Sequence, residues 1–453
     1  MSSQIQRREL LRIGGLSICA AASCNTFGAP VATWKSNSDR SCIFIMLQGG
    51  LSQLDTWDPK PDAVPEIRGP FQHIQTATPG LNFGELLPKS AAISECLTVI
   101  RSMTHKFTKH IAGTYITLTG SNNQQDRDRE AHGDDFPGPG AVLNYLAPKL
   151  TTAGGSQIQD TTGSGSVPRS VSVPNWLSIP GPSNRMPGQF AGFLGSIHDP
   201  FLVEGDPSSK EYRPLALSLP DGVDSRRMET RLTLTRQLDS AARLLESELN
   251  ARYNHLRDSA YSMVVSGKIR KALDLGQEPD ALRDRYGRNR FGQSLLLARR
   301  LVEAGVQFVS FNEFNQKWDT HGGLVGRYKQ IVPEMDAAFA ALVQDLADRG
   351  MLEQTLVVNT GEFGRTPQIN NLNGRDHWPN VYSTVLAGGG LSGGTRYGKS
   401  DSRGAEVLAH PVSPADVLAT MWHSLGISPT EELRDRLNRP RLLSEGRILT
   451  ELS

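Results

Sequence analysis

Carboxylate and imidazole side chains recur in the sequence at points where loops are expected to follow buried strands. One such group is Asp319 and His321, in the segment Trp318-Asp-Thr-His-Gly-Gly323. Their spacing of two residues directs both side chains to one side of an extended loop, and the glycines after them leave room for a ligand or an ion. An Asp-x-His pair is often only a hydrogen-bonded structural pair, so on its own it is a weak indication of a metal site.

Two more groups strengthen the metal interpretation. Glu362 lies in Gly361-Glu-Phe-Gly-Arg-Thr-Pro367 directly after an apolar run, and Asp376 and His377 follow in Gly374-Arg-Asp-His-Trp-Pro379. Mixed carboxylate and imidazole ligands on neighbouring strand ends suit zinc, manganese or iron. Calcium is a further candidate for the divalent metal ion. Taken together, these residues predict a metal site.

Two further histidines, His105 and His110, follow another apolar run, and a helix is predicted to begin near His110. A helix N-terminus has spare N–H groups and is a good place for an anion such as phosphate or sulfate. Both histidines are candidates for an acid, a base, a nucleophile or an additional ligand, and loop histidines held by hydrogen bonds are an equally good interpretation. No glycine motif matches a phosphate-binding fingerprint, so a nucleotide cofactor is not expected.

Apolar runs separated by helical patterns supply the elements that position these residues. Buried strands are predicted at 41–47, 97–101, 306–311 and 355–359, each followed by a polar or glycine-bearing loop. Amphipathic helices are predicted at 229–254, 291–304 and 332–349. This alternation implies an α/β fold with a doubly wound, mostly parallel sheet and helices on both faces, in which ligands bind beyond the carboxyl ends of the strands.

The composition is that of a globular protein. Of 453 residues, 38% are hydrophobic and 21% are charged, which is enough to form a large core. Lysine and arginine (48) balance aspartate and glutamate (47), so the charge total gives no reason to expect a nucleic-acid partner. Of four cysteines, Cys19 and Cys24 lie in or beside the apolar N-terminal segment, and the two that remain, Cys42 and Cys96, are too few for a disulfide framework or a thiolate zinc site. Small-molecule or carbohydrate chemistry is the better expectation.

Residues 1–32 are predicted to form an export signal. Arg7 and Arg8 precede an apolar run from Ile13 to Ala22, about half the length that spans a bilayer, so no stable membrane anchor is expected. The arginine pair is typical of the twin-arginine route, which carries folded proteins to the periplasm or beyond and would make its export machinery a partner. It implies that a cofactor is loaded before export. A buried N-terminal helix and a lipoprotein signal at Cys24 are the weaker alternatives.

The remainder, residues 40–453, is predicted to be one α/β domain with two interruptions. The segment 151–166 is rich in Gly, Ser and Thr and low in apolar residues, which indicates a flexible excursion. The region from about 230 to 300 is predicted to form a helical insertion.

Several motifs, which occur in order over nearly the whole chain, resemble one bacterial family. They are the twin-arginine start, LQGGLSQLDTWDPKPD, RSMTH, GFLGSIHDPF, WDTHGG, GEFGRTPQIN, GRDHWPN and HPVSPADVLAT. The chain resembles the family called domain of unknown function 1501, in which planctomycetes are rich. That family is similar to the alkaline phosphatase superfamily of sulfatases and phosphatases, and its members are often labelled sulfatase-like. The resemblance implies an alkaline-phosphatase-like fold with metals at the strand ends.

The resemblance also suggests roles for single residues. Asp319 and His321 would stand for the superfamily's Asp and His after one late strand, and Glu362 would replace the Asp at the end of the next. His377, with Asp376 beside it, would be the final histidine ligand. Asp55 would approximate the Asp after the first strand, although it lies several residues later than usual.

One family feature has no counterpart in this sequence. Sulfatases carry a Cys or Ser in C/S-x-P-S-R shortly before L-T-G; here Leu118-Thr-Gly120 is present, but the nucleophile position falls on His110. We therefore expect a metal-dependent hydrolase of phosphate or sulfate esters on a small molecule or polysaccharide, with His110 or His105 moving protons. The alternative is a catalytically silent protein that binds sulfated polysaccharide and has lost the nucleophile.

Overall fold

The computed structural model describes residues 40–153, 167–179, 182–212, 267–313 and 316–453, with single positions at 227, 230 and 234. The predicted export signal, the helix predicted at 229–254 except for positions 230 and 234, and residues 154–166 of the predicted excursion lie outside this description. The part of the chain considered below belongs to one compact unit, Lys35–Ser453.

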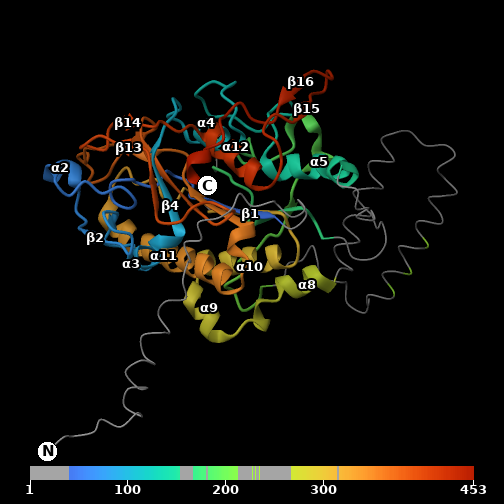
Figure 1. Cartoon of the computed structure of the whole chain (residues 1–453), viewed down its shortest axis with the longest axis horizontal. Helices are drawn as coiled ribbons and strands as arrows, with labels where there is room; N and C mark the ends of the chain where they lie inside the picture. Colours follow the sequence, from blue (N-terminus) through green and yellow to red (C-terminus); the bar gives the residue numbers. More distant parts are fainter. Residues whose placement is uncertain are drawn as a thin grey trace, which may run out of the picture. The chain divides into compact units, whose positions relative to one another are not determined.

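A central sheet of eight strands organises this unit (Figure 1). In spatial order the strands are β12 (Thr395–Tyr397), β4 (Leu97–Met103), β11 (Tyr382–Ala387), β8 (Thr355–Thr360), β1 (Ser41–Met46), β7 (Phe308–Asn312), β5 (Ser170–Val173) and β6 (Phe201–Leu202). The four predicted strands are confirmed as β1, β4, β7 and β8. The predicted α/β fold with a doubly wound, mostly parallel sheet is also confirmed.

One strand runs against the others. β11 pairs antiparallel with both β4 and β8, whereas the remaining pairs in the sheet are parallel. Its first residue, Tyr382, pairs with Met103 at the carboxyl end of β4. The loop that enters β11 therefore lies at the same edge of the sheet as the loops that leave β1, β4, β7 and β8.

Alternating side chains of the strands bury both faces of the sheet, as the period of two residues requires. In β1, Ile43 and Ile45 pack in one hydrophobic cluster with α10 (Arg290–Glu303) and α11 (Leu324–Asp348). Cys42 and Phe44 point to the other face, where they pack with α4 (His110–Thr119), α5 (Pro139–Ala153) and α12 (Pro414–Ser424). Figure 1 shows these two sets of helices on opposite sides of the sheet.

Short elements complete the unit. The helices are α2 (Pro65–Arg68), α3 (Pro88–Ala92), α8 (Gly267–Leu273) and α9 (Asp280–Tyr286), with 3-10 turns at Ser94–Cys96, Gly192–Leu194, Ser196–His198, Leu275–Gln277, Leu352–Gln354 and Thr450–Leu452. The two-stranded pairs are β2 (His73–Gln75) with β3 (Asn82–Gly84), β9 (Gly364–Arg365) with β10 (His377–Trp378), β13 (Lys399–Ser400) with β14 (Val407–Ala409), and β15 (Glu432–Arg434) with β16 (Pro440–Leu442).

The helices that matter most for the site have clear ends. α4 begins at His110, as predicted, and ends at Thr119; the next residue, Gly120, caps it with a positive φ of 69°, the left-handed conformation that glycine adopts readily. α10 closely matches the helix predicted at 291–304 and is capped by Asn289, whose side chain accepts from Gly292 N. α11 begins eight residues before the predicted start at 332 because Pro333 is accommodated inside the helix. Among the described residues, no helix is long and apolar enough to cross a membrane.

Candidate metal centre

The loops at the carboxyl edge of the sheet bring together residues that are far apart in the sequence. His110 begins α4 after β4, and Asp319 and His321 follow β7. Glu362 follows β8, and His377 opens the segment that leads into β11. His377 lies here because β11 is antiparallel to its neighbours, so the loop that precedes β11, and not the loop that follows it, lies at this edge.

Asp319 is the centre of the group. Its Oδ2 lies 3.4 Å from Nε2 of His110, and its Oδ1 lies 3.1 Å from Nε2 of His321 and 3.3 Å from Nε2 of His377. The ligand atoms of His110, Asp319 and His377 all lie within 4.8 Å of one another, so the three could hold one metal ion. The Nε2 atoms of His321 and His377 are 3.0 Å apart.

Each of the three histidines is held from behind by an oxygen atom at its Nδ1. Nδ1 lies 2.6 Å from Glu362 Oε1 in His110, 2.6 Å from Asp376 Oδ1 in His321 and 2.7 Å from the carbonyl oxygen of Thr108 in His377. In a neutral ring, an oxygen acceptor at Nδ1 favours the tautomer with the hydrogen there, which leaves the Nε2 lone pair free for a metal ion. This is how metal-binding histidines are usually oriented in proteins.

Glu362 is therefore placed behind His110. Its side chain is fully buried, and Oε1 accepts hydrogen bonds from both Gly49 N and His110, whereas Oε2 has no hydrogen-bond partner among the residues that the structure describes. Gly113, one turn into α4, allows the helix to approach this carboxylate closely, because a Cβ at Gly113 would lie 3.3 Å from Cβ of Glu362. A larger side chain at this position would require α4 or the Glu362 loop to shift by a few tenths of an ångström.

The electrostatics of the group favour a cation among these side chains. Burial would lower the pKa of His110, but its hydrogen bonds to Asp319 and Glu362 raise that pKa to about 9. Burial would likewise raise the pKa of Asp319, but the hydrogen bonds of His110 and His377 and the charge of Arg365 hold it well below its usual range. Burial lowers the pKa of His377, which keeps its ring neutral near pH 7.

Arg365 is a second cation at this centre. Its fully buried guanidinium donates to Asp319 Oδ1 at 2.6 Å, to Gly50 O at 3.0 Å, to Arg375 O at 3.0 Å and to Gly49 O. It thus joins the loops after β1 and β7 to the loop that enters β11. Because these acceptors already engage its N–H groups, we assign Arg365 to holding the site together.

Asp55 lies away from the group around Asp319. Its carboxylate is fully buried and pairs with Arg375, whose Nε is 2.8 Å from Oδ2, and it also accepts from Ser52 Oγ at 2.5 Å. Arg375 in turn donates to the carbonyl oxygens of Ile67 and Thr366. Asp55 therefore supports the turn that presents Asp376 and His377.

His105 and Asp376 also touch the centre indirectly. His105 Nδ1 lies 3.0 Å from Phe107 N, and its Nε2 lies 2.6 Å from the carbonyl oxygen of Glu362, so main-chain groups engage both ring nitrogens. Burial lowers the pKa of His105 to about 4. The carboxylate of Asp376 contacts His321 and Asn370, and its pKa is lowered first by the hydrogen bond with His321.

Sequence reasoning missed Arg365, Arg375 and the carbonyl of Thr108. The two arginines stand inside the GEFGRTP and GRDHW motifs, so their place beside the candidate ligands was a signal. No pattern in the sequence could indicate the role of Thr108, because a main-chain carbonyl is present at every residue.

The fold and the site define an α/β protein with a carboxylate and imidazole cluster at the carboxyl edge of its sheet. The family model described as "Protein of unknown function (DUF1501)" matches residues 39–453. The chain belongs to this family, as its motifs predicted. No curated protein matches the sequence.

Solved structures to which the chain is similar include a sulfatase and a phosphonate monoester hydrolase. "Ps i-CgsB" has a TM-score of 0.38 and 11% identity, with 86% of this chain and 72% of that chain covered. "PsFucS1 sulfatase from Pseudoalteromonas sp." has a TM-score of 0.37 and 11% identity, covering 86% and 68%. The phosphonate monoester hydrolase of Agrobacterium radiobacter has a TM-score of 0.31 and 12% identity, covering 90% and 76%. Similarity this distant says nothing of activity or substrate.

Proposed function

We propose that the protein is a metal-dependent hydrolase of phosphate or sulfate esters. The observation that carries the proposal is the convergence of three imidazole Nε2 atoms on the carboxylate of Asp319, with two of them 3.0 Å apart. Each Nδ1 faces an oxygen acceptor, so the two close Nε2 atoms of His321 and His377 would set lone pair against lone pair. A cation held by Nε2 of His377 and by Asp319 relieves that conflict, because it occupies the lone pair of His377 and leaves that of His321 free.

The donor set fits a divalent ion. His110, Asp319 and His377 supply two imidazole nitrogens and a carboxylate oxygen, which is typical of catalytic zinc sites that keep an open position. The same residues suit manganese, and calcium fits less well because it prefers oxygen ligands. The protonated state of His110 is consistent with this assignment, because the two carboxylates that retain its proton would also attract a metal ion in its place.

When bound, the ion would polarise the ester oxygens and stabilise the charge that grows on the leaving oxygen. The chain's own residues would orient the substrate and move protons. His321 is the most exposed of the three histidines, with 43% of its side chain accessible, and Asp376 orients it from behind. We assign it the transfer of a proton between water and the leaving oxygen.

His110 and His105 differ in this scheme. His110 would serve as a ligand through Nε2, with Glu362 fixing its ring. His105 would hold the loop after β4 against Glu362, because both of its nitrogens contact the main chain.

The test is turnover of an aryl phosphate and an aryl sulfate by the purified chain. The protein is stripped with a chelator and reloaded with zinc, manganese or calcium, each in a separate sample. We expect activity with at least one ion and its loss in Asp319→Asn. Asp348→Asn, an exposed carboxylate on α11, is the matched control and should retain activity.

Failure of every ion to restore turnover of either ester would contradict the hydrolase. If the folded chain then bound sulfated polysaccharide, the silent binding protein would be favoured.

We also propose export by the twin-arginine route to the periplasm or the cell exterior. The support is the Arg7-Arg8 pair followed by a short apolar run. Folding before export would allow the metal to be loaded in the cytoplasm.

A further inference from the structure

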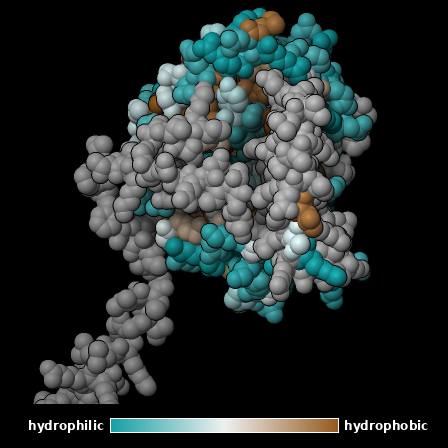
Figure 2. Space-filling model, turned by 90° about the vertical axis from the view of Figure 1, so that its right-hand side faces the viewer, coloured by the Kyte–Doolittle hydropathy of each residue, from teal (hydrophilic) through white to brown (hydrophobic). Residues whose placement is uncertain are grey.

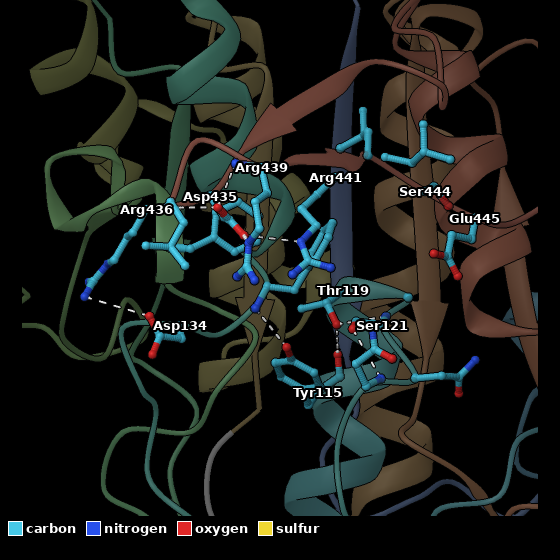
Figure 3. A pocket seen from close by; sticks show the side chains of 18 residues that line it. Tyr115, Thr119, Ser121, Asp134, Asp435, Arg436, Arg439, Arg441, Ser444 and Glu445 are labelled. Carbon is cyan, nitrogen blue, oxygen red and sulfur yellow. Dashed lines mark hydrogen bonds and ion pairs between the residues drawn. The ribbon is translucent and has the colours of Figure 1, made fainter.

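A separate cavity lies at the far end of α4 from the metal centre (Figure 3). α4 begins at His110 in the metal centre, and its last residue, Thr119, lines this cavity. At 1.5 Å per residue the two ends of the helix are about 13 Å apart. The cavity has a volume of about 500 Å³, which is in the range of small-molecule sites.

Three arginines from one turn dominate one wall of the cavity. Arg436, Arg439 and Arg441 belong to the hairpin of β15 and β16, and Figure 3 shows them above Tyr115, Thr119 and Ser121. Their side chains are 56%, 58% and 45% exposed, respectively. Asp134, Asp435 and Glu445 also line the cavity, so its formal charge is balanced as a whole, and the positive charge is concentrated on the wall that carries the three arginines.

Contacts within the hairpin engage only some of the N–H groups of these arginines. Arg439 Nε donates to Asp435 Oδ2 at 2.7 Å, and Arg441 Nε lies 3.4 Å from the same oxygen. Asp435 Oδ1 is occupied by the main-chain N–H groups of Leu437 and Arg439. Within the described residues, no acceptor engages the terminal Nη groups of Arg439 and Arg441.

The acidic residues of the wall leave these groups unsatisfied. Asp435 holds the turn, and its hydrogen bonds with Arg439 and the turn N–H groups, which outweigh the effect of burial, lower its pKa to about 2. Asp134 lies 4.0 Å from Arg436, and Glu445 lies on the other side of the cavity (Figure 3).

The rest of the lining suits a ligand with both hydroxyl groups and an apolar face. Polar side chains come from Ser121, Asn122 and Asn123, and apolar ones from Phe136, Phe193 and Leu442. The top of the molecule in Figure 2, where Figure 1 places the β15–β16 hairpin, is mainly hydrophilic with small hydrophobic patches.

We propose that this pocket binds a sulfate or phosphate group carried on a sugar-sized, hydroxylated molecule, through the terminal N–H groups of Arg439 and Arg441. Guanidinium groups bind such oxyanions through paired, charge-assisted hydrogen bonds, which are stronger than neutral ones. The hydroxyl and amide groups of the loop after α4 take the remainder of the ligand. The proposal does not depend on catalysis at the metal centre, since it concerns binding alone.

The test is calorimetric titration of the full chain with glucose 6-sulfate, glucose 6-phosphate, inorganic sulfate and glucose. We expect both sugar esters to bind, inorganic sulfate to bind more weakly, and glucose not to bind. Binding should weaken as ionic strength rises, because the contacts are partly exposed. The same titrations on His377→Ala separate this pocket from the metal centre, since the proposed binding should persist there.

The variant that tests the contacts is Arg439→Gln with Arg441→Gln. Loss of two charge-assisted hydrogen-bond partners should weaken binding of glucose 6-sulfate by at least about tenfold. The matched control is Arg434→Gln, on the same hairpin but outside the lining, which should bind as the wild type does. If the double variant loses its fold, Arg441→Gln alone should still weaken binding several-fold, because Arg441 makes the looser contact with Asp435.

Several results would overturn the proposal. They are no binding of either ester, glucose binding as tightly as its esters, binding that survives the double variant, and binding that disappears in His377→Ala. Inorganic sulfate binding as tightly as the sugar esters would overturn the part that concerns the sugar-sized body.

Discussion

The buried ion pair of Asp55 and Arg375 allows a prediction whose magnitude follows from the structure. Both side chains have no exposed area, and Asp55 contacts Arg375 through Nε at 2.8 Å and through Nη2 at 3.4 Å. Asp55→Ala would leave the guanidinium buried and still hydrogen-bonded to the carbonyls of Ile67 and Thr366, but without a countercharge. Removing one partner of a buried ion pair lowers the free energy of unfolding by about 3–5 kcal/mol. Because the carbonyl groups still accept hydrogen bonds from Arg375, we expect a loss near the lower value, about 3 kcal/mol.

The assay is urea unfolding of the wild type and Asp55→Ala. The free energies of unfolding are compared if the two proteins have the same dependence of that free energy on urea concentration (m value). Glu432→Ala is the control, because it breaks the pair with Arg434 in which the side chains are 47% and 54% exposed. Exposed pairs contribute about 0–1 kcal/mol. A loss below about 1 kcal/mol for Asp55→Ala, equal to that of the control, would refute the view that Asp55 neutralises Arg375.

The same variant should affect the metal centre. Arg375 immediately precedes Asp376 and His377, so a loosened turn would orient His377 less well. We expect weaker metal binding in Asp55→Ala even at low temperature, where the chain stays folded. Unchanged metal affinity in the folded variant would show that the turn is held by other contacts.

Three further predictions concern the site and export. Metal affinity should rise with pH up to about 9, by roughly tenfold per pH unit, because His110 must lose its proton before it can bind the metal. A titration with a metal indicator that shows no pH dependence of the affinity between pH 7 and 9 would contradict this. The metal-free protein should lose stability as pH rises from about 6.5 to about 9. The reason is that His110 has a higher pKa in the folded chain than in the unfolded chain, so it stabilises the folded state only while it is charged. Thermal unfolding of His110→Gln should show no such loss. Replacing Arg7 and Arg8 with lysine should leave the precursor in the cytoplasm, and fractionation that finds the variant outside the inner membrane would count against the twin-arginine route.

The sequence determined the elements of the fold and most of the chemistry at the sheet edge. Short continuous apolar runs such as Ser41 to Leu47, which end at polar or glycine-bearing loops, favour strands buried on both faces, so β1, β4, β7 and β8 were predictable from local pattern. The side chains after these runs had to lie at one edge, because parallel strands share the direction of their carboxyl ends. Residue type and position alone therefore predicted that Asp319, His321 and Glu362 lie at this edge.

Tertiary structure decided which of those side chains meet and in what role. β11 was not predicted, and its antiparallel direction brings His377 to the same edge from a segment that precedes a strand. Asp55 looks like a ligand in the sequence, but it is paired with Arg375, 320 residues away, and such a contact leaves no local pattern. Likewise, the positions of Glu362 behind His110 and of Asp376 behind His321 depend on how whole loops pack, because a hydrogen bond fixes the direction of a ring only after the chain has placed both partners.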